Sequence, residues 1–515
     1  MDRRHVLKLA LATSGAAWLP RSSWSQPRLT SKPFTLGVAS GSPLHDSVVL
    51  WTRLMGNLPS QPVTVRWEIA HDEQFARVVQ RGQQQALPEL AHSVHVEAGG
   101  LEPDRWYFYR FMTGDAVSAV GRTRTMPAPD AAAARLRLSY ASCQRWDYGY
   151  FSAYKHMVKE DLDLVLFLGD YIYEYPGTTR NPVRMPTGSW VITLDDYRAR
   201  HALHRGEPEL QAMHAACPWL VTWDDHEVQN DYAGLNVGEN GPAVADFAKR
   251  RAGAYQAFYE HMPLRAAVLT RAVEGLVSGA ETRVYSQQRF GNLANFVMLD
   301  DRQYRDDHAC NPQGKPGSAT IDPGTCAIWE DPKRTMLGAA QEQWLDGVFA
   351  KAGATWTVLG QQTLFAQRDF KPGPEQGFWN DGWDGYPAAR RKLAESLQRN
   401  KVANPVFLGG DVHENWVGHV KADYARADSA AVGVEFCGTS ITSRSFDYDV
   451  NPVLAENPHF VFADNKKKGY GVVELTPTRL VTKLRVVDDV TKADTKIDTL
   501  ATFAVEAGRA RIERV

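Results

Sequence analysis

Six short apolar segments in the second part of the chain end in side chains of the kinds that bind metal ions or phosphate. The segments are LRLSYASC, LDLVLFLGD, PWLVTWDDHE, ANFVMLDDRQY, TWTVLGQQ and NPVFLGGDVHENW. Such runs predict buried strands of an α/β domain, and ligands collect at the carboxyl ends of strands of this type. The polar ends are Cys143; Asp170 with Tyr173; Asp224, Asp225 and His226; Asp300, Asp301 and Arg302; Gln361 with Gln362; and Asp411 with His413. Together they predict one shared site.

The first part of the chain has a different pattern, in which apolar and polar residues alternate. Segments such as SVVLWTRL, VTVRWEIA and RWYFYRF repeat with a period of two and are separated by turns. This pattern predicts antiparallel strands of a small sandwich of the immunoglobulin or fibronectin III type, and Tyr107 stands where such domains carry a tyrosine corner. We expect a β-sandwich over residues 29–127 and an α/β catalytic domain over 133–515.

The N-terminus, MDRRHVLKLALATSGAAWLP, is typical of a twin-arginine export signal. Arg3 and Arg4 precede a weakly apolar run that is too short to span a bilayer, and no later stretch approaches the length of a membrane helix. Residues 1–28 are therefore expected to be a signal peptide that engages the twin-arginine machinery. We expect a periplasmic or secreted protein without a transmembrane anchor.

The balance of charges narrows the choice of partners. The 58 basic and 60 acidic residues nearly cancel, so there is no electrostatic argument for nucleic acid or a membrane surface as a partner. A small substrate is favoured.

Cys310 and Cys326 flank the loop NPQGKPGSATIDPGT, and in an oxidising compartment we expect them to form a disulfide, with two buried thiols as the alternative.

The mixture of ligand types at the strand ends points to metal ions. Several carboxylates and imidazoles in one crevice repel one another unless a cation neutralises them. The phenol of Tyr173 and the thiol of Cys143 suit a ferric centre, whereas carboxylate and amide oxygens suit Ca²⁺, Mg²⁺ or Mn²⁺. We expect two unlike ions bridged by Asp170.

Five ordered motifs resemble those of the PhoD-type alkaline phosphatases and phosphodiesterases, which are related to the purple acid phosphatases. They are YASCQ, GDYIY, WDDHEVQND, LDDRQYR and GGDVHENW. The resemblance implies a metallophosphatase-type layered αββα catalytic domain. It also implies an Fe³⁺ ion held by Cys143, Asp170, Tyr173 and His413, and a Ca²⁺ ion held by Asp170, Asp225 and Asp411. Asp224 and Asn230 are candidates for a second calcium.

Two departures from the purple acid phosphatase pattern bear on the second metal. Position 225 is Asp where that pattern has Asn, and position 411 is Asp where it has His. Because a carboxylate replaces an imidazole at position 411 and a neutral amide at position 225, the second site becomes harder and favours calcium over zinc.

The expected activity is hydrolysis of phosphate esters, as an alkaline phosphatase with phosphodiesterase capacity that uses a metal-activated hydroxide. His226 is expected to contact the phosphoryl group or to protonate the leaving oxygen, with a satisfied core histidine as the alternative. Arg302 is expected to clamp the phosphate, or else to pair only with nearby carboxylates. Trp379, Trp383 and Tyr386 either line the pocket mouth or pack among themselves.

Other functions compatible with these residues are a phospholipase D-like phosphodiesterase, a sulfatase-like esterase and a non-catalytic exported calcium-binding protein. The substrate is accordingly expected to be a small phosphate ester, with a phospholipid or another diester as alternatives. Spacing in the sequence does not distinguish monoesters from diesters.

Overall fold

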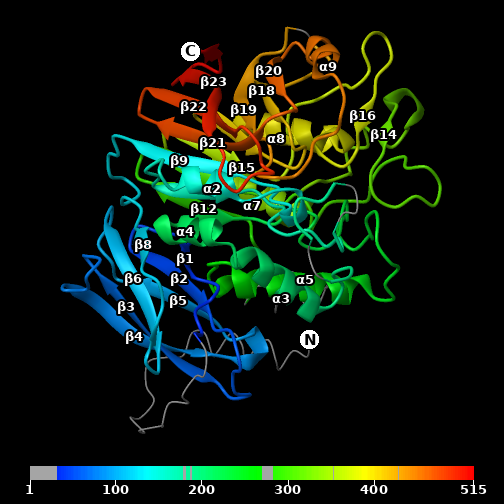
Figure 1. The fold of residues 1–515 in the computed structure, drawn as a ribbon. Coiled ribbons are helices and arrows are strands. Elements are labelled where there is room, and N and C mark those ends of the chain that lie inside the picture. Colours follow the sequence, from blue (N-terminus) through cyan, green and yellow to red (C-terminus); the bar gives the residue numbers. More distant parts are fainter. Residues whose placement is uncertain (1–31, 178–180, 186–187, 270–281, 352, 427) are drawn as a thin grey trace.

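Two large β-sheets form the centre of the molecule (Figure 1). The computed structural model describes residues 32–515 except 178–180, 186–187, 270–281, 352 and 427. The signal peptide expected at residues 1–28 lies outside the described residues. The architecture is mixed α/β with several sheets, as the sequence predicts.

The first sheet has ten strands and joins the two ends of the chain. Its order is β24 (Ile512–Arg514), β23 (Ile497–Glu506), β22 (Arg479–Val487), β21 (Lys468–Leu475), β9 (Leu136–Ala141), β10 (Leu164–Phe167), β11 (Trp219–Val221), β1 (Val38–Gly41), β2 (Ser47–Arg53) and β5 (Ser93–Gly99). The second sheet has seven strands, in the order β12 (Ser286–Phe290), β13 (Ala294–Met298), β15 (Trp356–Gly360), β17 (Pro405–Gly409), β19 (Ala431–Cys437), β18 (Asn415–Lys421) and β20 (Phe460–Asp464).

These two sheets pack face to face through one apolar core. On β10, Leu164 and Leu166 belong to this inner core together with Phe296 of β13 and Val358 of β15. The alternate residues of the same strands point to the opposite faces, because side chains alternate along a strand. The central strands are therefore buried on both sides, which explains why they read as continuous apolar runs.

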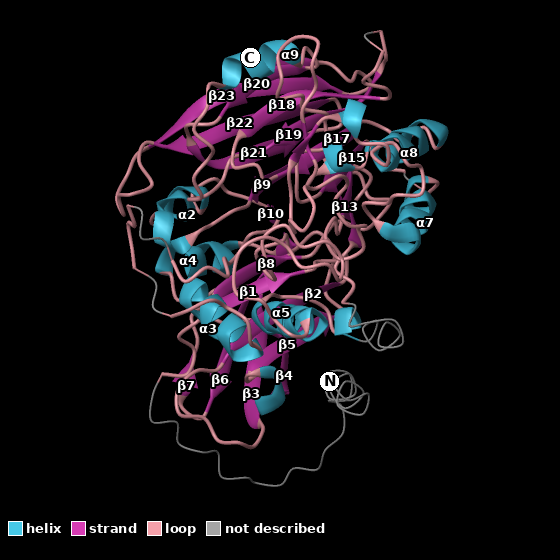
Figure 2. Cartoon of the chain, turned by 90° about the vertical axis from the view of Figure 1, so that its right-hand side faces the viewer, coloured by secondary structure: helices cyan, strands magenta, loops and turns pink. Residues whose placement is uncertain are grey.

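Helices cover the outer faces of the two sheets. Against the first sheet lie α2 (Ser152–Met157), α3 (Leu194–Arg205), α4 (Pro208–Ala216) and α5 (Phe247–His261); against the second lie α7 (Gly338–Phe349) and α8 (Pro387–Arg399). Figure 2 shows the strands between α2 and α4 on one side and α7 and α8 on the other. The short α9 (Val450–Glu456) packs beside β20.

The N-terminal strands form two facing sheets around their own core, in which Val48, Leu50, Tyr107 and Phe111 are buried. One of these sheets consists of β4 (Val78–Ala86), β3 (Val63–Ala70), β6 (Trp106–Thr113), β7 (Ala116–Val117) and β8 (Gly121–Arg124). Tyr107 Oη accepts a hydrogen bond from the backbone N–H of Glu102 at 2.9 Å. This contact resembles a tyrosine corner.

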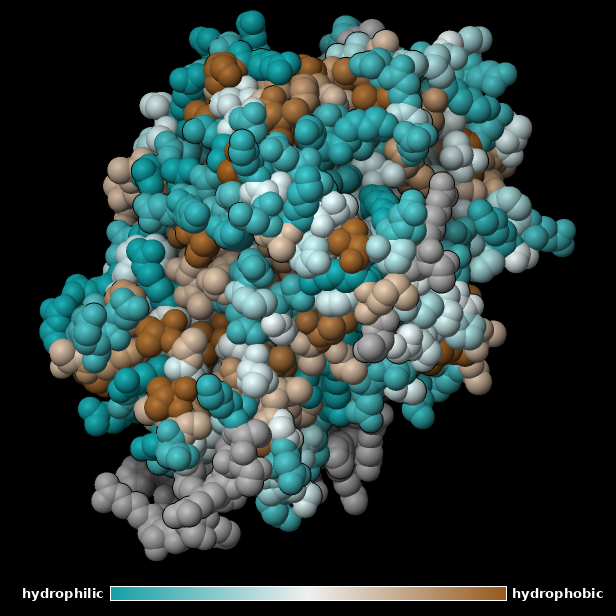
Figure 3. Space-filling view, in the orientation of Figure 1, coloured by the Kyte–Doolittle hydropathy of each residue, from teal (hydrophilic) through white to brown (hydrophobic). Residues whose placement is uncertain are grey.

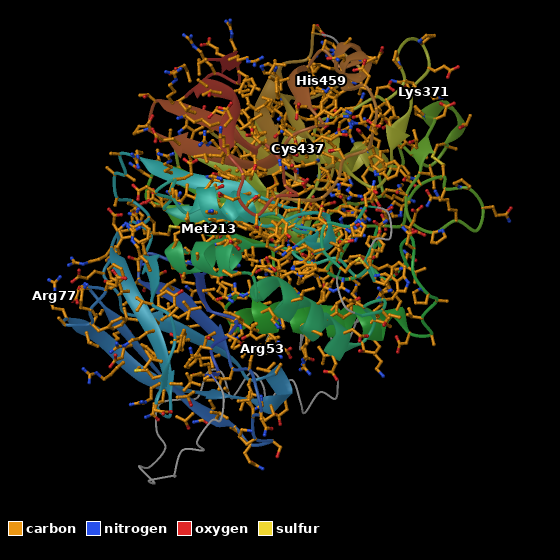
Figure 4. The ribbon with its side chains drawn as sticks, in the orientation of Figure 1. Arg53, Arg77, Met213, Lys371, Cys437 and His459 are labelled. Carbon is orange, nitrogen blue, oxygen red and sulfur yellow. A yellow bond between two sulfur atoms is a disulfide. The ribbon has the colours of Figure 1, made fainter. Side chains whose placement is uncertain are left out.

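The other N-terminal sheet continues into the ten-stranded sheet. Strand β1 pairs in parallel with β11 at Gly41 and Trp219, so β1, β2 and β5 extend the same sheet that carries β9 and β10. We call this junction between the N-terminal strands and the rest of the molecule the seam. It is reinforced by a hydrogen bond of 3.0 Å from Trp51 Nε1 to the carbonyl of Glu260 on α5. In Figure 4, Arg53 lies at this seam and Arg77 at the outer edge of the N-terminal strands. The alternating sequence pattern did not predict this continuity.

Cys310 and Cys326 are joined by a disulfide with a Cα–Cα distance of 5.7 Å, which confirms the prediction from the sequence. The loop between them includes β14 (Thr320–Ile321), which pairs with β16 (Phe378–Trp379). Cys143, Cys217 and Cys437 are free and buried.

The described helices and one face of the surface show how apolar residues are distributed. Among the described residues, no helix combines the length and the apolar character that crossing a bilayer requires. The face drawn in Figure 3 is mostly hydrophilic, and its apolar residues occur singly or in small groups.

The buried histidine at the seam predicts how stability depends on pH. His95 donates from Nε2 to the carbonyls of Tyr259 and Met262 at 2.9 and 3.0 Å, and burial lowers its pKa to about 4. An unfolded histidine has a pKa of about 6.5, so between these values only the unfolded chain takes up the proton. The contribution of His95 to the unfolding free energy should therefore fall by about 1.4 kcal/mol for each pH unit between 6.5 and 4.

Urea unfolding of the wild type and of His95→Gln at pH 7 and pH 5 checks this expectation. The wild type should lose about 2 kcal/mol more than the variant on acidification, because glutamine has no proton to gain. Equal losses in the two proteins would contradict this assignment. The other buried histidines are present in both proteins and cancel in the comparison.

Candidate metal centre

The polar residues that follow six strands meet at one edge of the two sheets. Strands β9, β10 and β11 are parallel in the first sheet, and β13, β15 and β17 are parallel in the second. Their carboxyl ends therefore point the same way within each sheet. A cavity of about 880 Å³ opens beside them, and its lining includes Asp170, Tyr173, Asp225, His226, Asn230, Asp411 and His413.

The four side chains expected to hold iron lie together. Ligand atoms of Cys143, Asp170 and His413 are all within 4.8 Å of one another. Tyr173 Oη lies 2.7 Å from Asp170 Oδ2 and 3.2 Å from His413 Nε2. A thiol, a carboxylate, a phenol and an imidazole from three separate strand ends thus converge on one point.

An unusual backbone conformation aims these ligands out of the strands. Cys143, Asp170, Asp411 and His413 have φ angles of 60°, 57°, 63° and 58°, in the left-handed region that non-glycine residues seldom adopt. Strain of this kind persists only where the surroundings fix it, and it is concentrated at functional sites.

The conformation of His413 is fixed by contacts at both ends of the residue. Its Nδ1 is 2.8 Å from the carbonyl of Arg444, which leaves Nε2 as the ligand atom toward Asp170. The His413 carbonyl accepts hydrogen bonds from Lys468 Nζ at 2.8 Å, Thr439 Oγ1 at 3.1 Å and Ser445 Oγ at 2.6 Å. Burial lowers the pKa of Lys468 to about 8.

A second set of oxygens surrounds the expected calcium position. Asp224, Asp225 and Asp411 have carboxylate oxygens within 4.8 Å of one another, and a further group joins Asp225 to Asp231 and Asp381. Asp231 and Asp381 are not among the ligands predicted from the sequence. Asp231 could have been found from its place at the end of WDDHEVQND, whereas Asp381 lies in a loop without a signal that singles it out.

The charge balance favours a bound cation at this cluster. Burial raises the pKa of Asp224, Asp225 and Asp411, and repulsion from neighbouring carboxylates adds to the effect, although Arg302 opposes it. Among the described residues, Asp224 Oδ2 has no hydrogen-bond partner despite its burial. A metal ion would satisfy this oxygen and relieve the repulsion.

Asp170 is the exception to this pattern. Burial acts to raise its pKa, but the nearby His226 and hydrogen bonds from His413 and Tyr173 outweigh burial and lower it. Its Oδ1 is buried without a hydrogen-bond partner in the described part of the chain. An ionised carboxylate with an unused buried oxygen is suited to bridging two metal ions.

The structure does not place Arg302 as a phosphate clamp. Its side chain is fully buried, and its guanidinium bonds to Asp224, Asp381 and Asp411. It is absent from the lining of the cavity among the described residues. This position fits the second role considered for Arg302, in which it only pairs with carboxylates. Its guanidinium does not pair with the adjacent Asp300 and Asp301, however, but with carboxylates from other loops.

His226 lines the cavity and is held by a residue that the sequence analysis did not identify. Its Nδ1 lies 2.7 Å from Glu174 Oε2, and Glu174 is completely buried. Burial acts to lower the pKa of His226, but the charges of Asp225 and Glu174 outweigh it and raise the pKa well above the usual value. An imidazolium at this position can donate a proton or a hydrogen bond into the cavity.

The remaining candidates divide between cavity and scaffold. Asn230 lines the cavity, and its Oδ1 accepts a hydrogen bond of 2.9 Å from Tyr175. Gln362 donates to Thr222 Oγ1 and to the Trp223 carbonyl at 2.8 Å, so it bridges strand ends within the protein.

The aromatic residues between β16 and the start of α8 are likewise divided between the two roles. Trp379 lines the cavity, whereas Trp383 and Tyr386 are buried in the core between the second sheet and its helices.

Comparisons with known proteins agree along nearly the whole chain. Residues 138–484 match the model of the PhoD-like phosphatase family, and residues 20–127 match that of the N-terminal domain of PhoD-like phosphatases. Alkaline phosphatase D of Bacillus subtilis (strain 168) is 45% identical over 504 residues, which cover 95% of this chain and 83% of the relative. A solved structure of PhoD is 44% identical, with a TM-score of 0.88 over 95% of this chain and 93% of that chain.

Gly169, before the bridging carboxylate, should tolerate no side chain. Its φ is 113°, and a Cβ placed on it would lie 2.4 Å from Asp224 Cβ. Gly169→Ala should therefore cost more than the roughly 1–3 kcal/mol of left-handed strain alone and should reduce metal content. Gly188→Ala is the matched control, because its φ is 119° and no atom lies within 4 Å.

Chemical unfolding and elemental analysis of both variants provide the measurement. If Gly169→Ala were no less stable than Gly188→Ala and bound the same amount of metal, the close approach of Gly169 to Asp224 would have no structural role.

Proposed function

The chain belongs to the PhoD-like phosphatase family and is a phosphatase, and we propose that it is an exported hydrolase of phosphate esters with an iron and calcium centre and with phosphodiesterase capacity. The observation that carries the metal assignment is the convergence of Cys143, Asp170, Tyr173 and His413 around a buried, unpartnered oxygen of Asp170.

The proposed architecture is the metallophosphatase-type αββα fold. Its support is the packing of the two large sheets on a shared apolar core, with helices on both outer faces. In this arrangement the loops after β10, β11 and β17 enclose the ligands between the two sheets.

Each metal position is assigned by ligand chemistry. Cys143, Asp170, Tyr173 and His413 would hold Fe³⁺, and Asp170, Asp225 and Asp411 would hold Ca²⁺. Asp224, Asn230 and the group formed by Asp225, Asp231 and Asp381 are candidates for a second calcium. Bound there, the metals would supply a water activated as a nucleophile at neutral pH and positive charge beside the phosphoryl oxygens.

His226 would act beside the metal ligands, with its ring centre 4.1 Å from that of Tyr173. With Glu174 Oε2 at Nδ1, its Nε2–H is the proton available to a phosphoryl oxygen or to the leaving oxygen. Glu174 would hold the imidazole in this orientation and stabilise its positive charge.

The cavity supports diesters as well as monoesters. Its volume of about 880 Å³ leaves room for organic groups on both sides of a phosphoryl group, and Phe370, Trp379, Phe446 and Tyr448 provide apolar surface in its lining. We therefore propose that the cavity accepts a phospholipid or another diester as well as a small monoester.

Export is proposed on two grounds. Arg3 and Arg4 precede an apolar run in the sequence, and the disulfide between Cys310 and Cys326 is of a kind that persists in oxidising compartments. We therefore place the protein in the periplasm or outside the cell, delivered by the twin-arginine machinery.

The reaction is tested with a nitrophenyl phosphate monoester and the matching diester. Asp170→Ala and Asp411→Ala should each lower kcat/KM by about 10³-fold or more, because each removes a carboxylate on which the electrostatics of the site depend. Asp494→Ala is the control, since that side chain is 91% exposed and pairs with Lys155 on the surface. Unchanged rates in both site variants would refute the assignment.

Metal identity is tested by elemental analysis and visible absorption of the purified protein. Iron and calcium should be present, and phenolate or thiolate ligation of ferric iron should colour the protein. Tyr173→Phe removes the phenolate, so it should shift or weaken the absorption band even where iron remains bound. A colourless preparation with zinc alone would contradict the assignment.

A further inference from the structure

We propose that Arg145, and not Arg302, is the arginine that contacts the phosphoryl group of the substrate. This inference rests on the proposed function, because it assigns a substrate contact within the same cavity. Its evidence is the position of Arg145, the way its guanidinium is held and the engagement of the other arginines nearby.

Arg145 stands two residues after Cys143 and lines the same cavity as the expected metal ligands. Its guanidinium carbon is 5.6 Å from the ring centre of Tyr173 and 4.6 Å from that of Tyr175. The cation therefore lies beside the phenol that we assign to iron, on the wall of the cavity in which the substrate would bind.

The backbone of Arg145 is tied to the loop that also holds Tyr173. Its N–H donates to Ser443 Oγ at 3.3 Å, and its carbonyl accepts from Thr442 Oγ1 at 2.7 Å. Ser443 Oγ is in turn 2.7 Å from Tyr173 Oη. The position of the guanidinium relative to the iron ligands is thus fixed by short, direct connections.

One edge of the guanidinium is already occupied. Nε donates to Asp147 Oδ1 at 2.9 Å and Nη2 lies 3.4 Å from Asp147 Oδ2, while the Asp147 side chain is only 6% exposed. Among the described residues, no hydrogen bond ties Nη1 to the protein. A guanidinium has five N–H donors, so Asp147 orients it and leaves the Nη1 edge for a ligand.

Two other arginines near the cavity are paired with carboxylates. Arg302 is fully buried among three carboxylates, and Arg368 pairs with Glu414 at 3.0 Å. Arg444 packs 4.0 Å from the ring centre of Tyr148, whose ring also has the Arg145 guanidinium at 4.1 Å. Two positive charges beside one ring make this wall of the cavity attractive to an anion.

The contact would strengthen as the reaction proceeds. Negative charge on the equatorial phosphoryl oxygens can be shared with a planar donor that is already oriented, so no reorganisation is needed. No bond to Arg145 forms or breaks. A lysine at this position would keep the charge and lose the orientation given by the two contacts to Asp147.

The test compares Arg145→Gln and Arg145→Lys with the wild type, each with its metal content measured. Arg145→Gln should lower kcat/KM for the nitrophenyl monoester by about 10²-fold, as the loss of one oriented donor in an active site does. Inorganic phosphate, measured by calorimetry, should bind at least about tenfold more weakly, because a charge-assisted hydrogen bond is lost. Arg145→Lys should recover part of both losses.

Arg184→Gln is the matched control. The Arg184 guanidinium lies 4.0 Å from the ring centre of Trp146, the residue next to Arg145, but pairs with Glu207 and is absent from the cavity lining among the described residues. It reports on disturbance of the loop alone, so its phosphate affinity and kcat/KM should stay within about threefold of wild type.

Asp147→Asn provides a second route if Arg145→Gln loses its metals. It keeps the cation but weakens its orientation, so phosphate affinity should fall by a few fold with metal content intact. Wild-type phosphate affinity in metal-loaded Arg145→Gln, or in both Arg145→Lys and Asp147→Asn, would overturn the proposal. Absence of turnover by the metal-loaded wild type would instead count against the proposed function, and phosphate binding would still report on Arg145.

Discussion

Repulsion among buried carboxylates is the constraint on which the catalytic half of the molecule depends. Asp224, Asp225 and Asp411 are brought together where the strands end, and burial raises the pKa of each and so opposes its ionisation. Arg302 offsets part of this charge from inside the protein. The negative charge that Arg302 does not offset would be neutralised by a cation bound at the site.

The scaffold supplies the rigidity that such a site requires. Left-handed residues at four ligand positions would relax if the strands before them could move. Strands β10 and β17, which precede three of these residues, are buried on both faces, between a shared core and the outer helices, so their ends are held firmly. Packing far from the cavity thus stabilises the strained backbone of the proposed metal ligands.

The sequence was most informative where function follows a regular element. Apolar runs followed by Asp170, Asp225 or His413 identified both the strands and the residues that meet in the cavity. It was least informative where contacts depend on long-range packing. The burial of Arg302, the support of His226 by Glu174 and the entry of Asp381 into the acidic group all arise from loops that meet only in the folded molecule. The N-terminal strands β1, β2 and β5 join the ten-stranded sheet where Gly41 of β1 pairs with Trp219 of β11, and no local sequence pattern indicates this pairing.

That pairing has a consequence for the order of events during synthesis. Strand β1 is made near the start of the chain but has no partner on its inner edge until β11 has been made. The N-terminal strands can close around their own core earlier, yet one edge of their sheet remains open until the first parallel strands of the second half are in place. An edge that waits in this way is exposed to wrong pairing, and the pairing of β1 with β11 removes that hazard.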